Sequence, residues 1–143
     1  MTAADLPEKR PVCEIEKVNN TGAIKQGKAG NNLTPGSYHM HHRINGELVA
    51  IGCFELTPKY FNSAYFMYKT KYAYLNLGVV GAMIELEFCR KLQEEAISPS
   101  LEYYHLGELV IDSPKVNYKL NYKPGEVLDP YSKQWIPYEK ALP

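Results

Sequence analysis

A β-hairpin between residues 37 and 56 constrains the fold more than any other part of the sequence. The stretch from 37 to 44 has the pattern of a strand, and ELVAIGCFEL, from 47 to 56, is mostly apolar. Asn45-Gly46 separates them, and this pair readily adopts the left-handed dihedral angles of a type I′ turn. The sequence therefore predicts two antiparallel strands joined by a tight turn.

Three further strands and one helix are expected after this hairpin. Strand-like runs occur at 63–69, 101–106 and 133–139, and Pro137 favours a sheet edge for the last of them. Asn76 occupies the N-cap position of the helix, and Ser98-Pro99 ends the segment. Between these limits, apolar and small residues recur at helical spacing, at Leu77, Val80, Gly81, Ile84, Phe88 and Leu92.

This order of elements predicts an α/β fold with a mixed, mainly antiparallel sheet and one main helix. One helix covers only one face of such a sheet, so we expect a partner chain or a missing N-terminal part to cover the other. Residues 1–34 are polar and rich in asparagine, glycine and lysine. We therefore expect a flexible segment at 1–34 and one domain at 35–143.

Composition excludes several classes of protein. Sixteen basic and sixteen acidic residues leave no net charge, so nothing attracts the whole chain to nucleic acid or to an anionic membrane. The first residues lack the apolar core of a signal peptide, and no run is long enough to span a membrane. The three cysteines are widely spaced, which argues against a disulfide framework. We expect a soluble, cytoplasmic protein in which Cys53 and Cys89 are buried.

The histidines of the hairpin could form a metal site or the edge of a cleft. Along a strand, His39 and His41 share one face and His42 points to the other. Zinc needs a third and a fourth ligand, and Glu55 is the only nearby candidate. We therefore expect no metal, and a hairpin that borders a substrate cleft.

Two glutamates lie where a carboxylate needs an explanation. Glu55 ends a strand that is nearly all apolar. Burial of a carboxylate there costs free energy unless it is paired with another group or takes part in binding or catalysis. The alternative is a glutamate at the end of a strand that simply reaches solvent. Glu85 lies within the helix beside Ile84, and the exposed helix face is the simpler expectation for it.

Two segments have features that suit phosphate. Read as a strand, KVNYKLNYKP places Lys115, Lys119 and Lys123 on one face, and the alternative is an ordinary amphipathic strand or turn. At the start of the helix, YLNLGVVGA offers unpaired backbone amides and the positive end of the helix dipole. Gly78 would allow close approach there, although small residues also let a helix pack closely on a sheet.

These stretches together resemble the C-terminal catalytic domain of arginyl-tRNA–protein transferases. The Gly-Ser-aromatic-His strand, turn and apolar strand of that family are matched by GSYHMHHRINGELVAIGCFELTP, and its aromatic strand leading into a helix by SAYFMYKTKYAYLNLGVVGAMIE. Its Tyr-Tyr-Met-Gly strand, and the Pro-Lys-Met and repeated Tyr-Lys after it, are matched by YYHLG and SPKVNYKLNYKPGEVLDP. The resemblance extends over residues 36–139.

The resemblance implies a GNAT-like acyltransferase fold that lacks its N-terminal part. It implies transfer of arginine from arginyl-tRNA to acceptor proteins with an N-terminal Asp or Glu, in the N-end rule route to ubiquitin-dependent protein breakdown. Because the aminoacyl ester is already activated, the protein must position both substrates and accept a proton, with no metal or cofactor. The resemblance also implies a turn or short helix at 114–118 in place of a strand.

Residue roles follow from this resemblance. His39 is the expected proton acceptor, and Glu55 is the expected carboxylate for the arginine guanidinium. The other expected substrate-binding residues are Tyr65, Tyr68, Glu85 and Tyr104. The expected tRNA contacts are Asn76, Gly78, Lys115 and Lys119.

Two other functions stay open on the sequence. The Tyr-Asp-Pro of the family corresponds to Tyr68-Lys69-Thr70, which loses an acidic residue, and the family's cysteine-rich N-terminal domain has no counterpart in this sequence. These departures fit a non-catalytic module that binds a protein N-terminus or a partner subunit. A generic acetyltransferase fits less well, because YLNLGVVG lacks a glycine-rich pyrophosphate turn.

Overall fold

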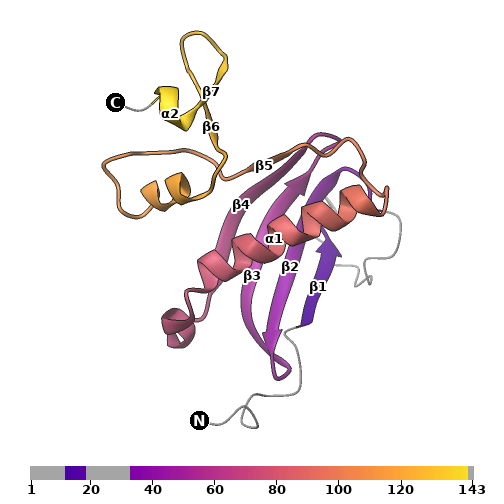
Figure 1. Ribbon diagram of the computed structural model, residues 1–143. Coiled ribbons are helices and arrows are strands. Elements are labelled where there is room, and N and C mark those ends of the chain that lie inside the picture. The colour runs from indigo at the N-terminus through magenta and orange to yellow at the C-terminus, as the bar shows by residue number, and fades with distance from the viewer. Residues whose placement is uncertain (1–11, 19–32, 142–143) are drawn as a thin grey trace. The chain divides into compact units, whose positions relative to one another are not determined.

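The computed structural model describes residues 12–18 and 33–141. The chain divides after His105 into two compact units, and each is described by itself (Figure 1). The expected single domain at 35–143 therefore consists of a larger unit that holds the main sheet and a smaller one that begins at Leu106.

The first unit is built on a five-stranded sheet in the order β1-β2-β3-β4-β5. The strands are β1 (Val12–Lys17), β2 (Gly36–Ile44), β3 (Glu47–Leu56), β4 (Tyr60–Tyr68) and β5 (Tyr103–His105). All neighbours are antiparallel except β4 and β5, which are parallel, so the predicted mixed sheet is confirmed. The hairpin is also confirmed, because Asn45 and Gly46 have positive φ angles of 50° and 81° between β2 and β3.

Strand β1 lies within the segment that we expected to be flexible. Val12–Lys17 pairs along its whole length with β2, and Ile15 packs against the core. For these residues the expectation is wrong. Strand β1 is stabilised by its pairing with β2. It is short and its sequence neighbours are polar, so the local pattern does not indicate a strand. Residues 1–11 and 19–32, on which the same expectation falls, lie outside the described residues.

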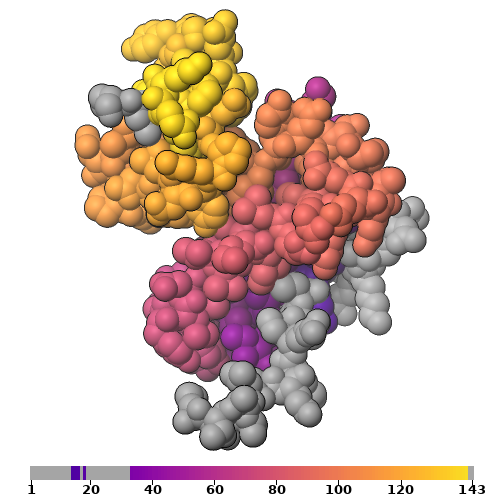
Figure 2. Space-filling model, viewed as in Figure 1, coloured from indigo at the N-terminus to yellow at the C-terminus, as the bar shows by residue number. Residues whose placement is uncertain are grey.

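The predicted helix is α1 (Leu77–Glu94), which follows a 3₁₀ turn, η2 (Thr70–Leu75). Asn76 precedes α1 as expected, but it does not cap the helix with its side chain. Its left-handed backbone, with φ 50° and ψ 45°, instead turns the chain from η2 into α1. Figure 1 shows α1 crossing one face of the sheet, and Figure 2 shows η2 and α1 on the surface of the first unit on that side.

The main core lies between α1 and the sheet. Along β2 and β3 the buried residues alternate with less buried ones, as expected for strands with one covered face. The ring of Phe54 stacks on Tyr38 and on Phe61, with centroids 5.3 and 4.3 Å apart. The buried cluster comprises Tyr38, Met40, Phe54, Leu56, Phe61, Cys89, Leu92 and Leu101. This cluster fixes which face of the sheet α1 covers.

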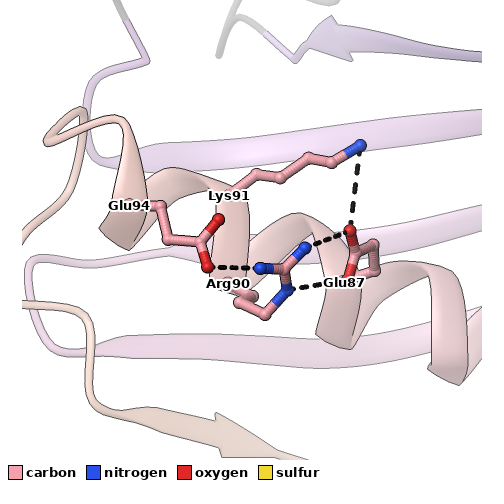
Figure 3. A network of polar contacts seen from close by, with 4 residues as sticks. All are labelled: Glu87, Arg90, Lys91 and Glu94. Atoms are coloured by element: carbon pink, nitrogen blue, oxygen red, sulfur yellow. Dashed lines mark hydrogen bonds and ion pairs between the residues drawn. The ribbon is translucent and has the colours of Figure 1, made fainter.

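The solvent side of α1 carries a network of charged residues (Figure 3). The guanidinium of Arg90 lies 2.7 Å from Glu87 Oε1 and also contacts Glu94, and Lys91 Nζ is 3.9 Å from Glu87 Oε1. All four side chains are about half exposed, so water and salt screen these pairs. The network marks the outer side of α1 and adds little to stability.

Gly81 sets how closely α1 can approach the sheet. A Cβ atom at this position would lie 2.2 Å from the nearest ring atom of Phe66 on β4. We expect Gly81→Ala to destabilise the first unit by about 1–3 kcal/mol, because overpacking outweighs the roughly 1 kcal/mol gained in helix propensity. Urea unfolding followed by circular dichroism measures the change.

Gly78 is the matched control for this substitution. It lies in the first turn of the same helix, and a Cβ there would have no atom within 4 Å. Gly78→Ala should therefore leave the free energy of unfolding unchanged or raise it slightly. Equal effects of the two substitutions would show that Phe66 does not require a glycine at position 81.

The second unit contains little regular structure. It holds a 3₁₀ turn, η3 (Asn117–Asn121), a two-stranded sheet of β6 (Glu126–Leu128) and β7 (Trp135–Pro137), and a short helix, α2 (Tyr138–Ala141). The strand expected at 133–139 is confirmed at β7, but it pairs with β6 in a sheet of its own. The strand interpretation of residues 115–123 is wrong, and the turn or short helix implied by the resemblance is the observed structure.

Among the residues that the structure describes, no helix has the length and apolar character needed to cross a membrane.

Candidate active site

The sheet face opposite α1, called the distal face, carries three of the predicted site residues. His39, Glu55 and Tyr65 lie on it, with Tyr65 73% exposed. As predicted, His39 and His41 share this face, with ring centroids 6.4 Å apart, and His42 is buried on the other. The cross-strand register also places on the distal face Glu14, Glu16, Ser37, Ile51, Cys53, Asn62, Met67 and His105.

Glu55 is hydrogen-bonded to Asn62 on the neighbouring strand, and Asn62 in turn contacts His105 on the strand beyond it. The Asn62 side-chain amide on β4 donates to Glu55 Oε2 on β3 over 3.3 Å. The Asn62 Oδ1 atom lies 2.8 Å from His105 Nδ1 on β5. Glu55 is exposed, and Asn62 and His105 are half-buried. The candidate site therefore includes an imidazole that the sequence analysis did not select.

The pairing between β4 and β5 ends with this group, because β5 ends at His105. They pair only over Tyr60–Asn62 and Tyr103–His105, whereas β4 continues to Tyr68. Its register with β3 also shifts by one residue after Ser63. Such a bulge increases the local twist of a strand and is often found next to active sites. Asn62 and His105 are thus the last pair of this short parallel pairing.

Glu85 lies on the opposite side of the sheet, under α1. It is only 1% exposed, so the expectation of an exposed helix position is wrong. The Tyr104 hydroxyl donates to Glu85 Oε2 over 2.6 Å. Gly52 on β3 makes room for the carboxyl group, because a Cβ there would lie 2.9 Å from Glu85 Oε1 and 3.7 Å from His42 Nε2. Two expected substrate-binding residues, Glu85 and Tyr104, are therefore together, with Glu85 buried and Tyr104 half-buried.

The protonation of this buried group differs from that of exposed residues. Burial raises the pKa of Glu85, and the hydroxyl groups of Tyr104 and Ser63 oppose that rise. Burial lowers the pKa of His42, and the neighbouring His41 lowers it further. Both shifts favour the neutral form, as expected where water is excluded.

The raised pKa of Glu85 predicts an effect on stability that depends on pH. The folded protein keeps this proton above pH 4.5, where an unfolded glutamate releases it. Glu85 therefore lowers wild-type stability as pH rises from 4.5 through its raised pKa, by up to about 1.4 kcal/mol per pH unit. Glu85→Gln does not titrate, so its free energy of unfolding relative to wild type should increase over this range. Urea unfolding from pH 4 to 8 tests this, and a difference independent of pH would contradict it.

The start of α1 is open to solvent. Asn76 and Gly78 are exposed, and nothing lies within 4 Å of a Cβ built on Gly78. The amides of Val79 and Val80 both bond to the Asn76 carbonyl, at 2.9 and 3.2 Å. The two expected tRNA contacts at this helix end are therefore accessible.

Three other predicted residues differ in accessibility. Tyr68 is 45% exposed but pairs with Ala50 on the α1 side of the sheet, so it does not share a face with Tyr65. In the second unit Lys115 is exposed, whereas Lys119 is buried and its ammonium donates to the Glu108 carbonyl. Burial also lowers the pKa of Lys119. Among the two lysines, only Lys115 is accessible to a phosphate.

The described residues include neither a cluster of metal ligands nor a cysteine with a lowered pKa. No group of three His, Cys, Asp or Glu side chains in this part of the chain is arranged to hold a metal ion. Burial raises the pKa of Cys89 to about 12 and also raises that of Cys53, so neither sulfur is activated as a thiolate. Cys89 is buried as expected, and Cys53 is half-buried on the distal face.

Sequence reasoning missed Asn62 and His105. Asn62 lies in the first part of β4, before the run from which we predicted that strand. His105 was part of a predicted strand, but it bonds to a residue 43 positions earlier in the chain. A histidine in a short apolar strand is the only local signal for it. The parallel pairing of β4 and β5 is needed to bring the two together.

Residues of both units match known proteins. Residues 12–129 match the family model described as arginine-tRNA-protein transferase, C terminus. The chain is 39% identical over 108 residues, 76% of its length, to arginyl-tRNA–protein transferase 1 of Arabidopsis thaliana. It is 32% identical over 138 residues, 94% of its length, to the protein of that name from Dictyostelium discoideum. It is also 25% identical over 91 residues, 64% of its length, to an aspartate/glutamate leucyltransferase of Campylobacter jejuni.

The chain spans about a fifth of the length of these eukaryotic relatives, 17% of the Arabidopsis protein and 21% of the Dictyostelium protein. It covers 35% of the leucyltransferase. The match extends from β1 through the sheet and α1 and into the second unit. The chain therefore belongs to the arginine-tRNA-protein transferase family, and the matching region is that family's C-terminal part.

Proposed function

We propose that this chain takes part in transfer of arginine from arginyl-tRNA to the α-amino group of protein N-termini. The family match over residues 12–129 is the observation that carries this proposal. The names of the relatives from Arabidopsis and Dictyostelium give the donor as arginyl-tRNA and the acceptor as protein. The name of the Campylobacter relative suggests acceptors that begin with aspartate or glutamate. Such a reaction would act in the cytoplasm, in the N-end rule route to ubiquitin-dependent breakdown.

The distal face supplies groups suited to this chemistry. Glu55 can bind a guanidinium, because a carboxylate accepts several hydrogen bonds and the bond from Asn62 uses only one of these sites. Tyr65 is exposed on the same face and can contact the arginine side chain. His39 lies there too and can accept a proton from the attacking amine.

The tRNA end would be held by exposed polar groups elsewhere. In the first unit, the amides at the start of α1, beside Asn76 and Gly78, suit a phosphate. In the second unit, taken by itself, Lys115 is exposed and offers a positive charge to RNA. Glu85 and Lys119 are buried, and the hydroxyl of the half-buried Tyr104 is bonded to Glu85, so we assign these three residues a supporting role in place of direct substrate contact. A further N-terminal part or a partner chain would complete the site over the distal face.

The test is an assay of the purified chain with arginyl-tRNA and peptides that begin with Asp, Glu or Ala. Incorporation of labelled arginine into the first two peptides alone supports the proposal. The second candidate function is a non-catalytic module, suggested by Lys69-Thr70 where the family has Asp-Pro. Saturable binding of the Asp and Glu peptides without any transfer would favour that module and reject catalysis by this chain.

A further inference from the structure

The outer edge of β4 has no neighbouring strand beyond Asn62. Strand β3 pairs with β4 from Phe61 to Tyr68, whereas β5 pairs only with the beginning of β4 and ends at His105. Residues 63–68, called the free edge below, therefore present a row of backbone groups to which no other described strand is bonded. Such an edge is a template for pairing with a further polypeptide.

One hydrogen bond at the end of β4 shows which backbone groups of the free edge face outward. The Lys69 amide donates to the Val49 carbonyl of β3 over 2.9 Å, so the N–H at position 69 points toward β3. Successive N–H groups of a strand point in opposite directions. The N–H groups of Tyr68 and Phe66 therefore point away from β3, and that of Met67 points toward it. Phe66 and Tyr68 each offer a further strand one donor and one acceptor.

The side chains beside the free edge are largely exposed to solvent. Tyr65 and Met67 lie on the distal face, where they are 73% and 56% exposed, and Tyr68 is exposed on the α1 side. The shift in register between β3 and β4 adds one residue, the small and exposed Ala64, at the start of this edge. A strand added here could pack its own side chains against these residues on both faces of the sheet.

The free edge begins at the candidate active site. It follows directly after Asn62, whose amide donates to Glu55, the carboxylate proposed to bind the guanidinium. An extended polypeptide alternates N–H and C=O groups in the same way as this edge, and such main-chain bonds give affinity when a peptide adds to a sheet. The sugar-phosphate backbone of RNA has no such alternation. The edge therefore suits the acceptor protein and not the tRNA.

We propose that the N-terminal segment of the acceptor protein binds to the free edge of β4 as an added parallel strand. The identity of this occupant rests on the proposed function. The first residue of the acceptor lies beside Ser63 and the next residues run toward Tyr68, which places the acceptor α-amine next to the group that holds the arginine. Because backbone bonds supply the affinity, the residues after the first contribute little specificity, and one edge can receive many different proteins.

Amide hydrogen exchange followed by nitrogen-15 NMR tests this pairing without an assay of transfer. The probe is a short synthetic peptide that begins with Asp and continues with alternating Val and Thr. Its addition should slow exchange of the Phe66 and Tyr68 amides by about tenfold or more, because these amides become hydrogen-bonded. The Met67 amide already faces β3 and is the internal control, so its exchange should change much less.

Peptides that carry a single N-methyl group test the pairing from the side of the ligand. Only alternate amides of an added strand face β4. Methylation of one of these amides should weaken binding by about tenfold, because it removes a backbone hydrogen bond. Methylation of the amides between them should have little effect. A loss of affinity that does not alternate along the peptide would show that no strand is added.

Tyr68→Pro tests the same bond from the side of the protein. Proline removes the outward N–H and is tolerated at a sheet edge where that N–H faces solvent. Tyr68→Ala is the matched variant, because it loses the same ring but keeps the N–H. We expect the proline variant to bind the peptide about tenfold more weakly than the alanine variant, and equal affinities would contradict the inference. Circular dichroism checks that both variants are folded, and the peptide series does not depend on either of them.

Strand pairing and transfer of arginine can fail independently. An alternating peptide series without transfer would reject catalysis by this chain and support the added strand. Transfer to the peptide without protection of the Phe66 and Tyr68 amides would overturn the added strand while the proposed function stands. Protection of these amides by arginyl-tRNA alone, or by self-association detected in sedimentation, would overturn the acceptor as the occupant of the free edge.

Discussion

Replacement of Phe54 by alanine is expected to lower the free energy of unfolding by about 3–5 kcal/mol. Phe54 is 1% exposed at the centre of the core. Its ring stacks on Tyr38 and Phe61 and meets Phe88 of α1 edge-on, with centroids 6.1 Å apart. The substitution removes all these contacts and leaves a cavity between helix and sheet. Urea unfolding followed by circular dichroism measures the loss.

Tyr74→Ala is the control for loss of an aromatic ring. Tyr74 lies in η2 and is 76% exposed, so its removal should change stability by no more than about 0.5 kcal/mol. A loss of less than 1 kcal/mol at Phe54 would contradict the position of the core as described between β3 and α1.

Glu55→Gln is expected to reduce arginine transfer by roughly ten- to a hundred-fold, if the chain has the proposed function. The glutamine keeps the shape of the side chain and can still accept the bond from Asn62, so the fold and this hydrogen bond should survive. The lost charge weakens binding of the guanidinium by about 1.5–3 kcal/mol. The assay measures kcat/KM with arginyl-tRNA as the varied substrate.

Glu14→Gln is the matched control for this loss of charge. Glu14 lies on the same distal face and pairs with Arg43 at 3.3 Å, and its side chain is 59% exposed. Transfer by this variant should stay within about two-fold of wild type, because exposed pairs of this kind contribute little. Equal activity of Glu55→Gln and wild type would mean that another residue binds the guanidinium.

Much of the first unit follows from local patterns in the sequence. Asn45-Gly46 specified the turn between β2 and β3, and the helical spacing from Leu77 to Leu92 specified α1. Alternation also predicted correctly that His39 and His41 lie on one face and His42 on the other. These features depend on residues close together in the chain, so a single sequence contains enough information for them.

The candidate site could be predicted only in part. Glu55 and His39 are predictable as candidate site residues because a titratable side chain is uncommon in an apolar strand unless it is paired or has a function. Glu85 was placed on the wrong side of α1, because helical spacing alone does not show that Gly52 leaves room for a carboxyl group beneath the helix. The sequence predicts an accessible cation at Lys119, whereas the fold of the second unit buries it against the Glu108 carbonyl.

The sequence alone was enough to predict β2, β3, β4, α1 and β5, their order, and which histidines of the hairpin share a face. The tertiary structure was needed to show β1, the face of the sheet that α1 covers and the distant residues that meet. Asn62 and His105 are 43 positions apart and meet because β4 and β5 are parallel neighbours. The physical reason is that side-chain periodicity is a local property of the backbone. Contacts between elements arise from packing that buries the apolar faces of all of them together.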